Sequence, residues 1–274
     1  MDLESTLHHL RESGEGAHMP HVYYGDPHEK FSLQLIHTLS NEADLLEFGV
    51  PFSDPTADGP TFQLACERAL RAGMTPLKCI QGIRKLRKEG ITVPIIVTTY
   101  YNIPYVYGIT SFVKAIHTAG AQAILVPNLP IEEAQPLFAA SRKHHIDVIL
   151  QISPATSQAR IQHIVKAAHG FIYIINVEGV TGARNRFHKS TFQLIDTVSK
   201  QTDIPLLAGF GISQSQHAEA MVAAGVDGVI VGSAYAKIYE KNLTHPATAL
   251  PKIQELAKQI KQGCIRGYNK RSRN

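Results

Sequence analysis

Short apolar segments rich in β-branched residues recur along the chain and alternate with segments that have a helical period. The apolar segments are MPHVYY (19–24), DLLEFG (44–49), VPIIVTTY (93–100), AQAILVP (121–127), IDVILQI (146–152), FIYIIN (171–176), IPLLAGF (204–210) and DGVIVG (227–232). The segments with helical periodicity include KFSLQLIHTL (30–39), PLKCIQGIRKLRKEG (76–90), PIEEAQPLFAASRKHH (130–145), SQARIQHIVKAAHG (157–170) and SQHAEAMVAAG (215–225).

This alternation predicts the class of fold. Continuous apolar strands between helices indicate a parallel sheet covered on both faces. Eight such units, with no linker and no break in composition, favour a closed (β/α)₈ TIM barrel over an open doubly wound sheet. We therefore predict an α/β protein in which residues 1–274 form a single domain. The barrel is expected to carry an extra N-terminal helix and a short phosphate-binding helix after the eighth strand.

Composition bears on the compartment. The chain is 44% hydrophobic and 18% charged, and its apolar runs are too short to span a membrane. Its first residues, MDLESTLHHLRESGEG, have no resemblance to a secretory signal, so we expect a cytoplasmic protein. Cys66, Cys79 and Cys264 are an odd number at wide spacings, which predicts reduced thiols, with Cys66 and Cys79 on helices.

The net charge of +4 comes from one end of the chain. Residues 258–274 contain six basic residues and no acid, which leaves 21 basic and 23 acidic residues elsewhere. No ladder of aromatic residues accompanies these charges, so a nucleic-acid-binding arm is disfavoured. We expect a basic C-terminal tail in solvent.

An acidic loop follows the second predicted strand. The stretch EFGVPFSDPTADGP (47–60) holds three carboxylates among three prolines and two glycines. Because side chains alternate along a strand, Leu46 and Phe48 should face the outer helices while Leu45 and Glu47 face the barrel axis. Glu47 would then point into the mouth at the carboxyl ends of the strands, where barrel enzymes carry out their chemistry.

Glycines at the ends of the last strands predict a phosphate site. Backbone amides can approach an anion closely at glycine, and barrels often bind phosphate with the loops after strands seven and eight. A nicotinamide cofactor is disfavoured, because GFGISQ lacks the final glycine of the dinucleotide fingerprint and does not follow the first strand. The residues concerned are Gly209, Gly211, Gly232 and Ser233, with Gly179 and Gly182 in a third loop.

The remaining clusters carry less information. The chain has 14 histidines, but no HExxH, no HxH and no cysteine at ligand spacing, so we expect no metal site. Several tyrosines follow the third strand, where they either pack in the core and loops or wall an aromatic substrate. These tyrosines are Tyr100, Tyr101, Tyr105 and Tyr107.

With these motifs at successive strand ends, the chain resembles the α subunit of tryptophan synthase over nearly its whole length. The most specific part is PFSDP followed by ADGP, which other phosphate-binding barrels of amino-acid synthesis lack. The shared motifs are GDP (25–27), VPFSDPTADGPT (50–61), TTYYN (98–102), VPNLPIEEA (126–134), GVTGAR (179–184), GFGIS (209–213) and GSA (232–234).

The resemblance implies a reaction, the retro-aldol cleavage of indole-3-glycerol phosphate to indole and glyceraldehyde 3-phosphate without a cofactor. Glu47 matches the family's general acid/base, with a pKa raised by its apolar surroundings. Asp58 matches the second catalytic acid, expected to stay ionised and to accept the indole N–H. Asp54 is assigned to holding the loop, and Thr181 matches a threonine that bonds the second acid when its loop closes.

Other positions match the family's substrate pocket. Tyr100 and Tyr173 match pocket residues, and His21 stands where the family tends to have an aromatic residue against the indole. The phosphate-binding positions are Gly182, Gly211, Gly232 and Ser233.

Four further features depart from the family pattern while leaving the acids and the phosphate site in place. Tyr23 and Tyr24 replace a small pair before GDP. Asn128 occupies the place of an aspartate, and Glu178 the place of a small residue.

The resemblance also implies a partner, a pyridoxal-phosphate β subunit that receives indole through a channel in an α2β2-type complex. Any pyridoxal phosphate belongs to that subunit, because this chain has no lysine in a Schiff-base setting. Two alternatives stay open: a stand-alone lyase that releases free indole, and a weakly catalytic subunit that mainly activates β.

Overall fold

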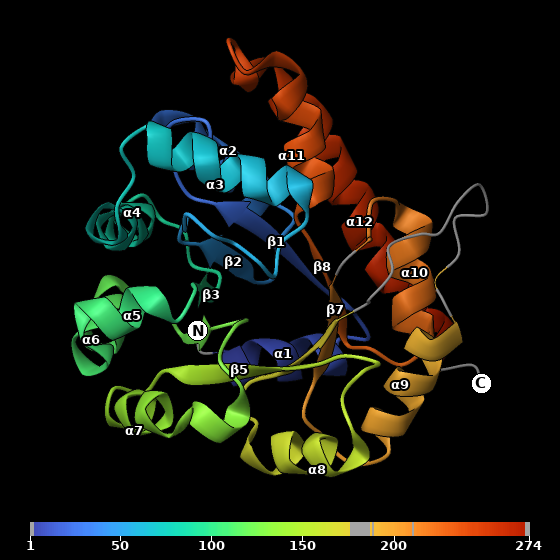
Figure 1. Ribbon diagram of the computed structural model, residues 1–274. Helices are drawn as coiled ribbons and strands as arrows, with labels where there is room; N and C mark the ends of the chain where they lie inside the picture. The colour runs from blue at the N-terminus through green and yellow to red at the C-terminus, as the bar shows by residue number, and fades with distance from the viewer. Residues whose placement is uncertain (1–2, 176–186, 188, 210, 272–274) are drawn as a thin grey trace.

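The computed structural model describes residues 3–175, 187, 189–209 and 211–271 (Figure 1). The predicted closed barrel is confirmed, because each strand pairs in parallel with the next and the last pairs with the first. The strands are β1 (Ala17–Tyr23), β2 (Leu46–Gly49), β3 (Ile95–Thr98), β4 (Ala123–Leu125), β5 (Asp147–Ile152), β6 (Ile172–Ile175), β7 (Leu206–Gly209) and β8 (Gly228–Val231).

Helices surround the barrel (Figure 1). The predicted placement of Cys66 and Cys79 on helices is confirmed, and both thiols are free and buried. Within the described residues, no helix combines the length and the apolar character that a membrane span requires. The helices are α1 (Leu3–Glu12), α2 (Glu29–Ser40), α3 (Pro60–Arg71), α4 (Pro76–Lys88), α5 (Asn102–Tyr107), α6 (Ile109–Ala119), α7 (Gln135–Lys143), α8 (Gln158–Ala167), α9 (Lys189–Ser199), α10 (Ser215–Ala223), α11 (Ser233–Tyr239) and α12 (Leu250–Arg271), with short 3₁₀ turns η1 (Ile131–Glu133), η3 (Glu240–Asn242) and η4 (Pro246–Ala249).

Strand alternation separates two apolar cores. Leu46 and Phe48 belong to the cluster between the barrel and the outer helices, whereas Leu45 belongs to the cluster inside the barrel. Both placements confirm the prediction from the sequence. Leu7 of α1 also joins the inner cluster, with Leu3 and Leu10, so the extra N-terminal helix closes the barrel at the amino ends of the strands.

The prediction of a solvated basic tail is wrong for residues 258–271, which form the second half of α12. Ile260 and Cys264 are buried on one face of this helix. Gly263 and Gly267 let α12 approach α10 closely, because a Cβ at Gly267 would lie 2.6 Å from the Glu219 carbonyl oxygen. The prediction failed because the count of charges in this segment does not show that its apolar residues are spaced to form one buried face of a helix.

The segment 130–145 also differs from the single periodic stretch that the sequence suggests. It forms η1 and then α7, with Pro136 in the first turn of α7. Proline has no N–H to donate and is favoured at the first helical positions, so it starts a new helix here instead of continuing the previous turn.

Candidate active site

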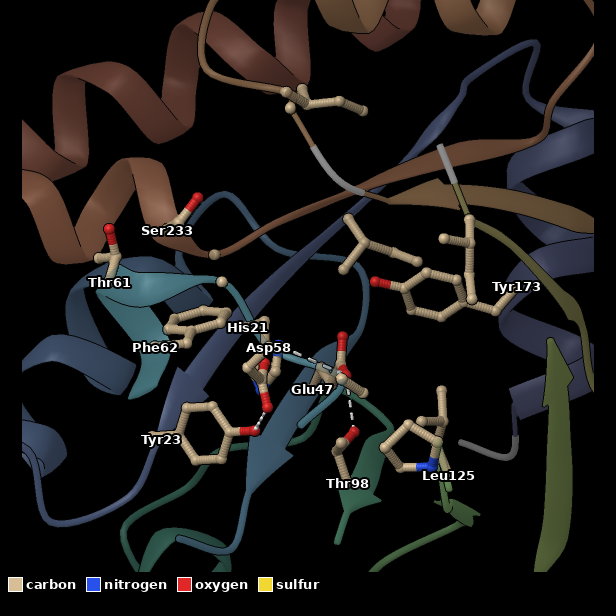
Figure 2. Close-up of a pocket in the computed structure, with 18 of the residues that line it drawn as sticks. His21, Tyr23, Glu47, Asp58, Thr61, Phe62, Thr98, Leu125, Tyr173 and Ser233 are labelled. Atoms are coloured by element: carbon tan, nitrogen blue, oxygen red, sulfur yellow. Dashed lines mark hydrogen bonds and ion pairs between the residues drawn. The ribbon is translucent and has the colours of Figure 1, made fainter. Parts of the chain in front are cut away.

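A cavity of about 540 Å³ opens at the carboxyl ends of the strands. Figure 2 shows side chains from several strand ends and from the start of α3 around it. The residues that line it include His21, Tyr23, Glu47, Asp58, Thr61, Phe62, Thr98, Leu125, Gln151, Tyr173, Ile175, Gly211, Ile212, Gly232, Ser233 and Lys237. Glu47 and Asp58, the two predicted catalytic acids, therefore line one cavity together with three of the predicted phosphate-site residues.

Glu47 lies on β2 with its side chain in the barrel, as predicted. Its Oε1 atom accepts a hydrogen bond of 2.6 Å from the Thr98 hydroxyl. Oε2 is buried and has no hydrogen-bond partner among the described residues. Burial raises the pKa of Glu47 to about 8, opposed by the Thr98 hydrogen bond and reinforced by the charge of Asp58. Glu47 is therefore protonated at neutral pH and titrates close to it.

Asp58 lies in the loop between β2 and α3, and two tyrosines hold it. The hydroxyls of Tyr23 and Tyr100 each donate a hydrogen bond of 2.6 Å to Oδ2 of Asp58. These bonds favour the ionised carboxylate, but burial is the larger effect and raises the pKa of Asp58 above its ordinary value overall. The expectation that Asp58 stays ionised remains a prediction.

His21 lies on β1 beside Glu47 and lines the cavity. Its Nδ1 atom is 3.4 Å from Oε1 of Glu47, and its Nε2 atom is buried without a hydrogen-bond partner among the described residues. Burial lowers the pKa of His21 to about 3, so the ring is neutral. A neutral imidazole presents an aromatic face to the cavity without adding charge beside Glu47.

The cavity has aromatic walls on two sides. The rings of His21 and Phe62 are 4.6 Å apart, and Tyr23 meets Phe62 edge to face at 5.1 Å. Figure 2 shows Tyr173 and Leu125 across the cavity from Phe62 and Tyr23. The space between these walls suits a flat apolar group.

The predicted phosphate site is described in part. Gly211, Gly232 and Ser233 line the cavity, and Lys237 brings a cationic side chain to the same end. A Cβ at Gly232 would collide with the Phe62 ring, so this glycine also makes room for the aromatic wall. Gly182 lies outside the described residues.

Other predicted site residues have different outcomes. Tyr100 is not among the lining residues; its hydroxyl donates to Asp58 and accepts a hydrogen bond from the backbone N–H of Ala57. Asp54 lies outside the cavity lining, where its carboxylate accepts a hydrogen bond from the Ser53 hydroxyl. Asn128 accepts a hydrogen bond of 2.8 Å from the backbone N–H of Tyr101. Thr181 and Glu178 lie outside the described residues.

Four residues that shape the cavity were not assigned to the site from the sequence, although Tyr23 was noted as a departure from the family pattern. Tyr23 has a signal, because it lies two positions after His21 on β1 and so shares its face. Phe62 has a weaker signal, since it follows GPT at the start of α3. Thr98 and Lys237 have no signal in the sequence beyond their positions, at the end of β3 and in α11 after β8. In the described part of the chain, no group of three or more histidine, cysteine or acidic side chains is arranged to hold a metal ion.

Comparisons with known proteins agree with this geometry. A family model described as "Tryptophan synthase alpha chain" matches residues 7–265. The tryptophan synthase alpha chain of Methanocaldococcus jannaschii is 41% identical over 243 residues, which are 89% of this chain and 86% of that one. The tryptophan synthase alpha chain of Methanopyrus kandleri is 37% identical and covers 98% and 97% of the two chains. A solved structure of Mycobacterium tuberculosis tryptophan synthase has a TM-score of 0.86 and 30% identity, covering 96% of this chain and 97% of that one.

Proposed function

The chain belongs to the family of tryptophan synthase alpha chains, whose alpha reaction is a lyase reaction, and from this premise we propose that it cleaves indole-3-glycerol phosphate with Glu47 and Asp58 as its catalytic pair. The observation that carries the proposal is the shared cavity. One space of about 540 Å³ brings together a neutral buried acid, a second acid held by two phenols, aromatic walls and a glycine-lined end with a lysine. Each part of the substrate has a matching surface.

Glu47 is suited to move both protons of the reaction. In its protonated form it donates a proton to C3 of the indole ring, which places positive charge on the ring. The glycerol hydroxyl then returns a proton to the carboxylate as the bond between C3 and the glycerol carbon breaks. The electron pair of that bond restores the indole, and the glycerol carbon becomes an aldehyde. Glu47 ends the cycle in the state in which it began.

Asp58 is suited to stabilise the charge that develops in between. An ionised carboxylate that accepts the indole N–H interacts more strongly with the protonated ring than with the neutral one. At the other end, Gly211, Gly232 and Ser233 with Lys237 form the surface for the phosphate. By the family resemblance we add Gly182 to the phosphate site and Thr181 to the loop that contacts Asp58.

The proposal extends to a β subunit as partner. Tyr105 and Val106 of α5, directly beyond the end of β3, are 70% and 85% exposed. Apolar and aromatic side chains on the rim of the mouth are suited to bury against another chain. A partner seated there receives indole as it leaves the cavity. We assign pyridoxal phosphate to that subunit alone and place the reaction in the cytoplasm.

The test is an assay of indole formation from indole-3-glycerol phosphate by the purified chain, with and without a β subunit. We expect slow release alone and marked stimulation in the mixture. Fast unaided release would favour the stand-alone lyase. No indole in either case, with faster turnover by β, would favour the activating subunit and contradict the proposed catalytic pair.

A further inference from the structure

We propose that Tyr23 is a positioning residue for the reaction, which together with Tyr100 clamps Oδ2 of Asp58 so that Oδ1 meets the indole N–H. The inference rests on the proposed role of Asp58. It concerns a position where the chain departs from the small residue of the family pattern, and the clamp is visible in Figure 2 as the bond between Tyr23 and Asp58.

The strand register explains why the Tyr23 ring reaches Asp58. Tyr23 is the last residue of β1 and pairs with Gly49 at the end of β2. A Cβ at Gly49 would lie 2.6 Å from Cδ1 of the Tyr23 ring. The absence of a side chain at Gly49 therefore opens the path along which the ring crosses β2 toward the acidic loop.

Packing then fixes the ring on its other sides. Tyr23 is only 2% exposed and forms a small buried cluster with Ala65 and Cys66 of α3. Phe62 meets the ring edge to face. The phenol has two soft torsions and both are restricted by these contacts, so little freedom is lost when its hydroxyl bonds the carboxylate.

Both phenols donate to the same oxygen, and this determines how Asp58 is presented. Hydrogen bonds of 2.6 Å from O–H to a carboxylate are short, charge-assisted contacts. They come from two different strand ends, β1 and the end of β3, so they fix the carboxylate in rotation as well as in position. No donor to Oδ1 is found among the described residues, which leaves that oxygen for the substrate.

The titratable groups that face Asp58 from the surrounding elements are consistent with a carboxylate that is held by the two tyrosine hydroxyls. Glu47 approaches from β2, Cys66 from α3, Tyr23 from β1, Tyr100 from the segment after β3 and Tyr173 from β6. Burial raises the pKa of the Cys66 thiol to about 12, so it is neutral. No cation is among these described neighbours, and the two tyrosine hydroxyls are the donors that stabilise the carboxylate here. Removal of one hydroxyl should raise the pKa of Asp58.

The experiment compares Tyr23→Phe with a matched control, Tyr24→Phe. The control also removes a buried-ring hydroxyl, but one that donates to Glu29 away from the cavity. Because the hydroxyl bond both holds and stabilises the charged carboxylate, Tyr23→Phe should lower kcat/KM by about 10-fold or more, mainly through kcat. The acid limb of its pH profile should move to higher pH. Tyr24→Phe should stay within about twofold of wild type with an unshifted limb.

A second variant keeps the shape of the ring. Fluorinated tyrosine at position 23 has a more acidic phenol, a stronger donor, and should move the acid limb to lower pH. Wild-type kcat/KM and an unshifted limb in both position-23 variants would overturn the inference. If Tyr23→Phe does not fold, an unshifted acid limb in the enzyme with fluorinated tyrosine is by itself enough to overturn the inference. A wild-type chain that forms no indole would instead contradict the proposed function.

Discussion

Glu47 and Asp58 are both carboxylic acids in one cavity, and their neighbours give them different properties. Glu47 is 2% exposed, and this burial outweighs the one hydroxyl donor on Oε1, so its neutral form is favoured and its pKa lies near 8. Asp58 is only half-buried and receives two hydroxyl donors, which favour its charge. These different environments are the basis for the proposal that Glu47 carries protons while Asp58 holds a charge.

These pKa shifts predict the pH dependence of the reaction. The rate kcat/KM should follow a bell, because Asp58 must lose its proton and Glu47 must keep its own. We expect the alkaline limb near pH 8, as burial places the pKa of Glu47 there. The measurement is kcat/KM between pH 5 and 10. Because Glu47 and Asp58 interact, the two pKa values read from the bell belong to the pair of acids together. A rate that keeps rising through pH 9 would show that Glu47 is not the proton donor.

The raised pKa of Glu47 also predicts how stability depends on pH, which tests this pKa independently of the kinetics. Since its folded-state pKa is raised from 4.5 to about 8, the folded chain holds a proton that the unfolded chain has lost between those pH values. The free energy of unfolding thus falls as pH rises from 4.5 to 8. At about 1.4 kcal/mol per pH unit, this amounts to roughly 4–5 kcal/mol. In Glu47→Gln this loss should disappear.

At the scale of elements, the two ends of the barrel have different tasks. The carboxyl ends carry the acids and the cavity, while α1 closes the amino ends with leucines that pack inside the barrel. Barrel enzymes keep chemistry at the first end and stability at the second. Changes in α1 should therefore alter stability without altering turnover.

Leu7→Ala tests this division. Leu7 is 2% exposed, and truncation of a buried leucine to alanine costs about 2–5 kcal/mol of unfolding free energy. His9 on the exposed face of α1 provides the matched control, and His9→Ala should change stability by less than about 0.5 kcal/mol. Denaturant unfolding gives the stabilities, and kcat should match wild type in both variants. A large fall in kcat for folded Leu7→Ala would contradict the division.

The elements also show what the sequence could and could not predict. Alternation in LLEFG correctly placed Leu45 and Glu47 inside and Phe48 outside, because a strand with two buried faces fixes the direction of each side chain. The hydrogen bond between Tyr23 and Asp58 could not be predicted from the sequence, since it depends on the register of β1 with β2 and on the space over Gly49. The bond between Tyr100 and Asp58 was equally unpredictable, because it depends on how the loop between β2 and α3 folds over the end of β3.

At the scale of the whole molecule, α12 ties the two ends of the chain together. Lys261 makes ion pairs of 2.8 Å with Glu15 before β1 and 2.9 Å with Asp44 before β2. Arg271 reaches Asp227, which also pairs with Arg11 of α1. The basic residues that the composition assigned to a solvated tail are in part ion-pair partners of acids in the folded chain, one of which, Asp227, is buried. Charge counts along a sequence do not distinguish these cases, because the partners are distant in the sequence: Asp44 lies 217 residues from Lys261, and Asp227 lies 44 residues from Arg271.

Lys261→Met tests the importance of this attachment. Loss of the ammonium group leaves Asp44 buried without its cation, so we expect a destabilisation of about 2–4 kcal/mol, visible as a lower Tm. Lys258 lies on the exposed side of the same helix, and Lys258→Met should leave Tm within about 1–2 °C of wild type. Equal Tm values for the two variants would show that the ion pairs of Lys261 contribute little. Either variant should keep wild-type kcat below its Tm.

Glu47 is the group proposed to carry the protons, and one measurement tests this role most directly. It combines kcat for indole formation with the Kd for indole-3-glycerol phosphate in Glu47→Gln. The amide keeps the size of the side chain and can accept the Thr98 hydroxyl bond, but it has no proton to exchange at neutral pH. We predict that indole formation is abolished while Kd stays within a few-fold of wild type. Turnover at the wild-type rate would contradict the account, because the proton would then have to come from another group.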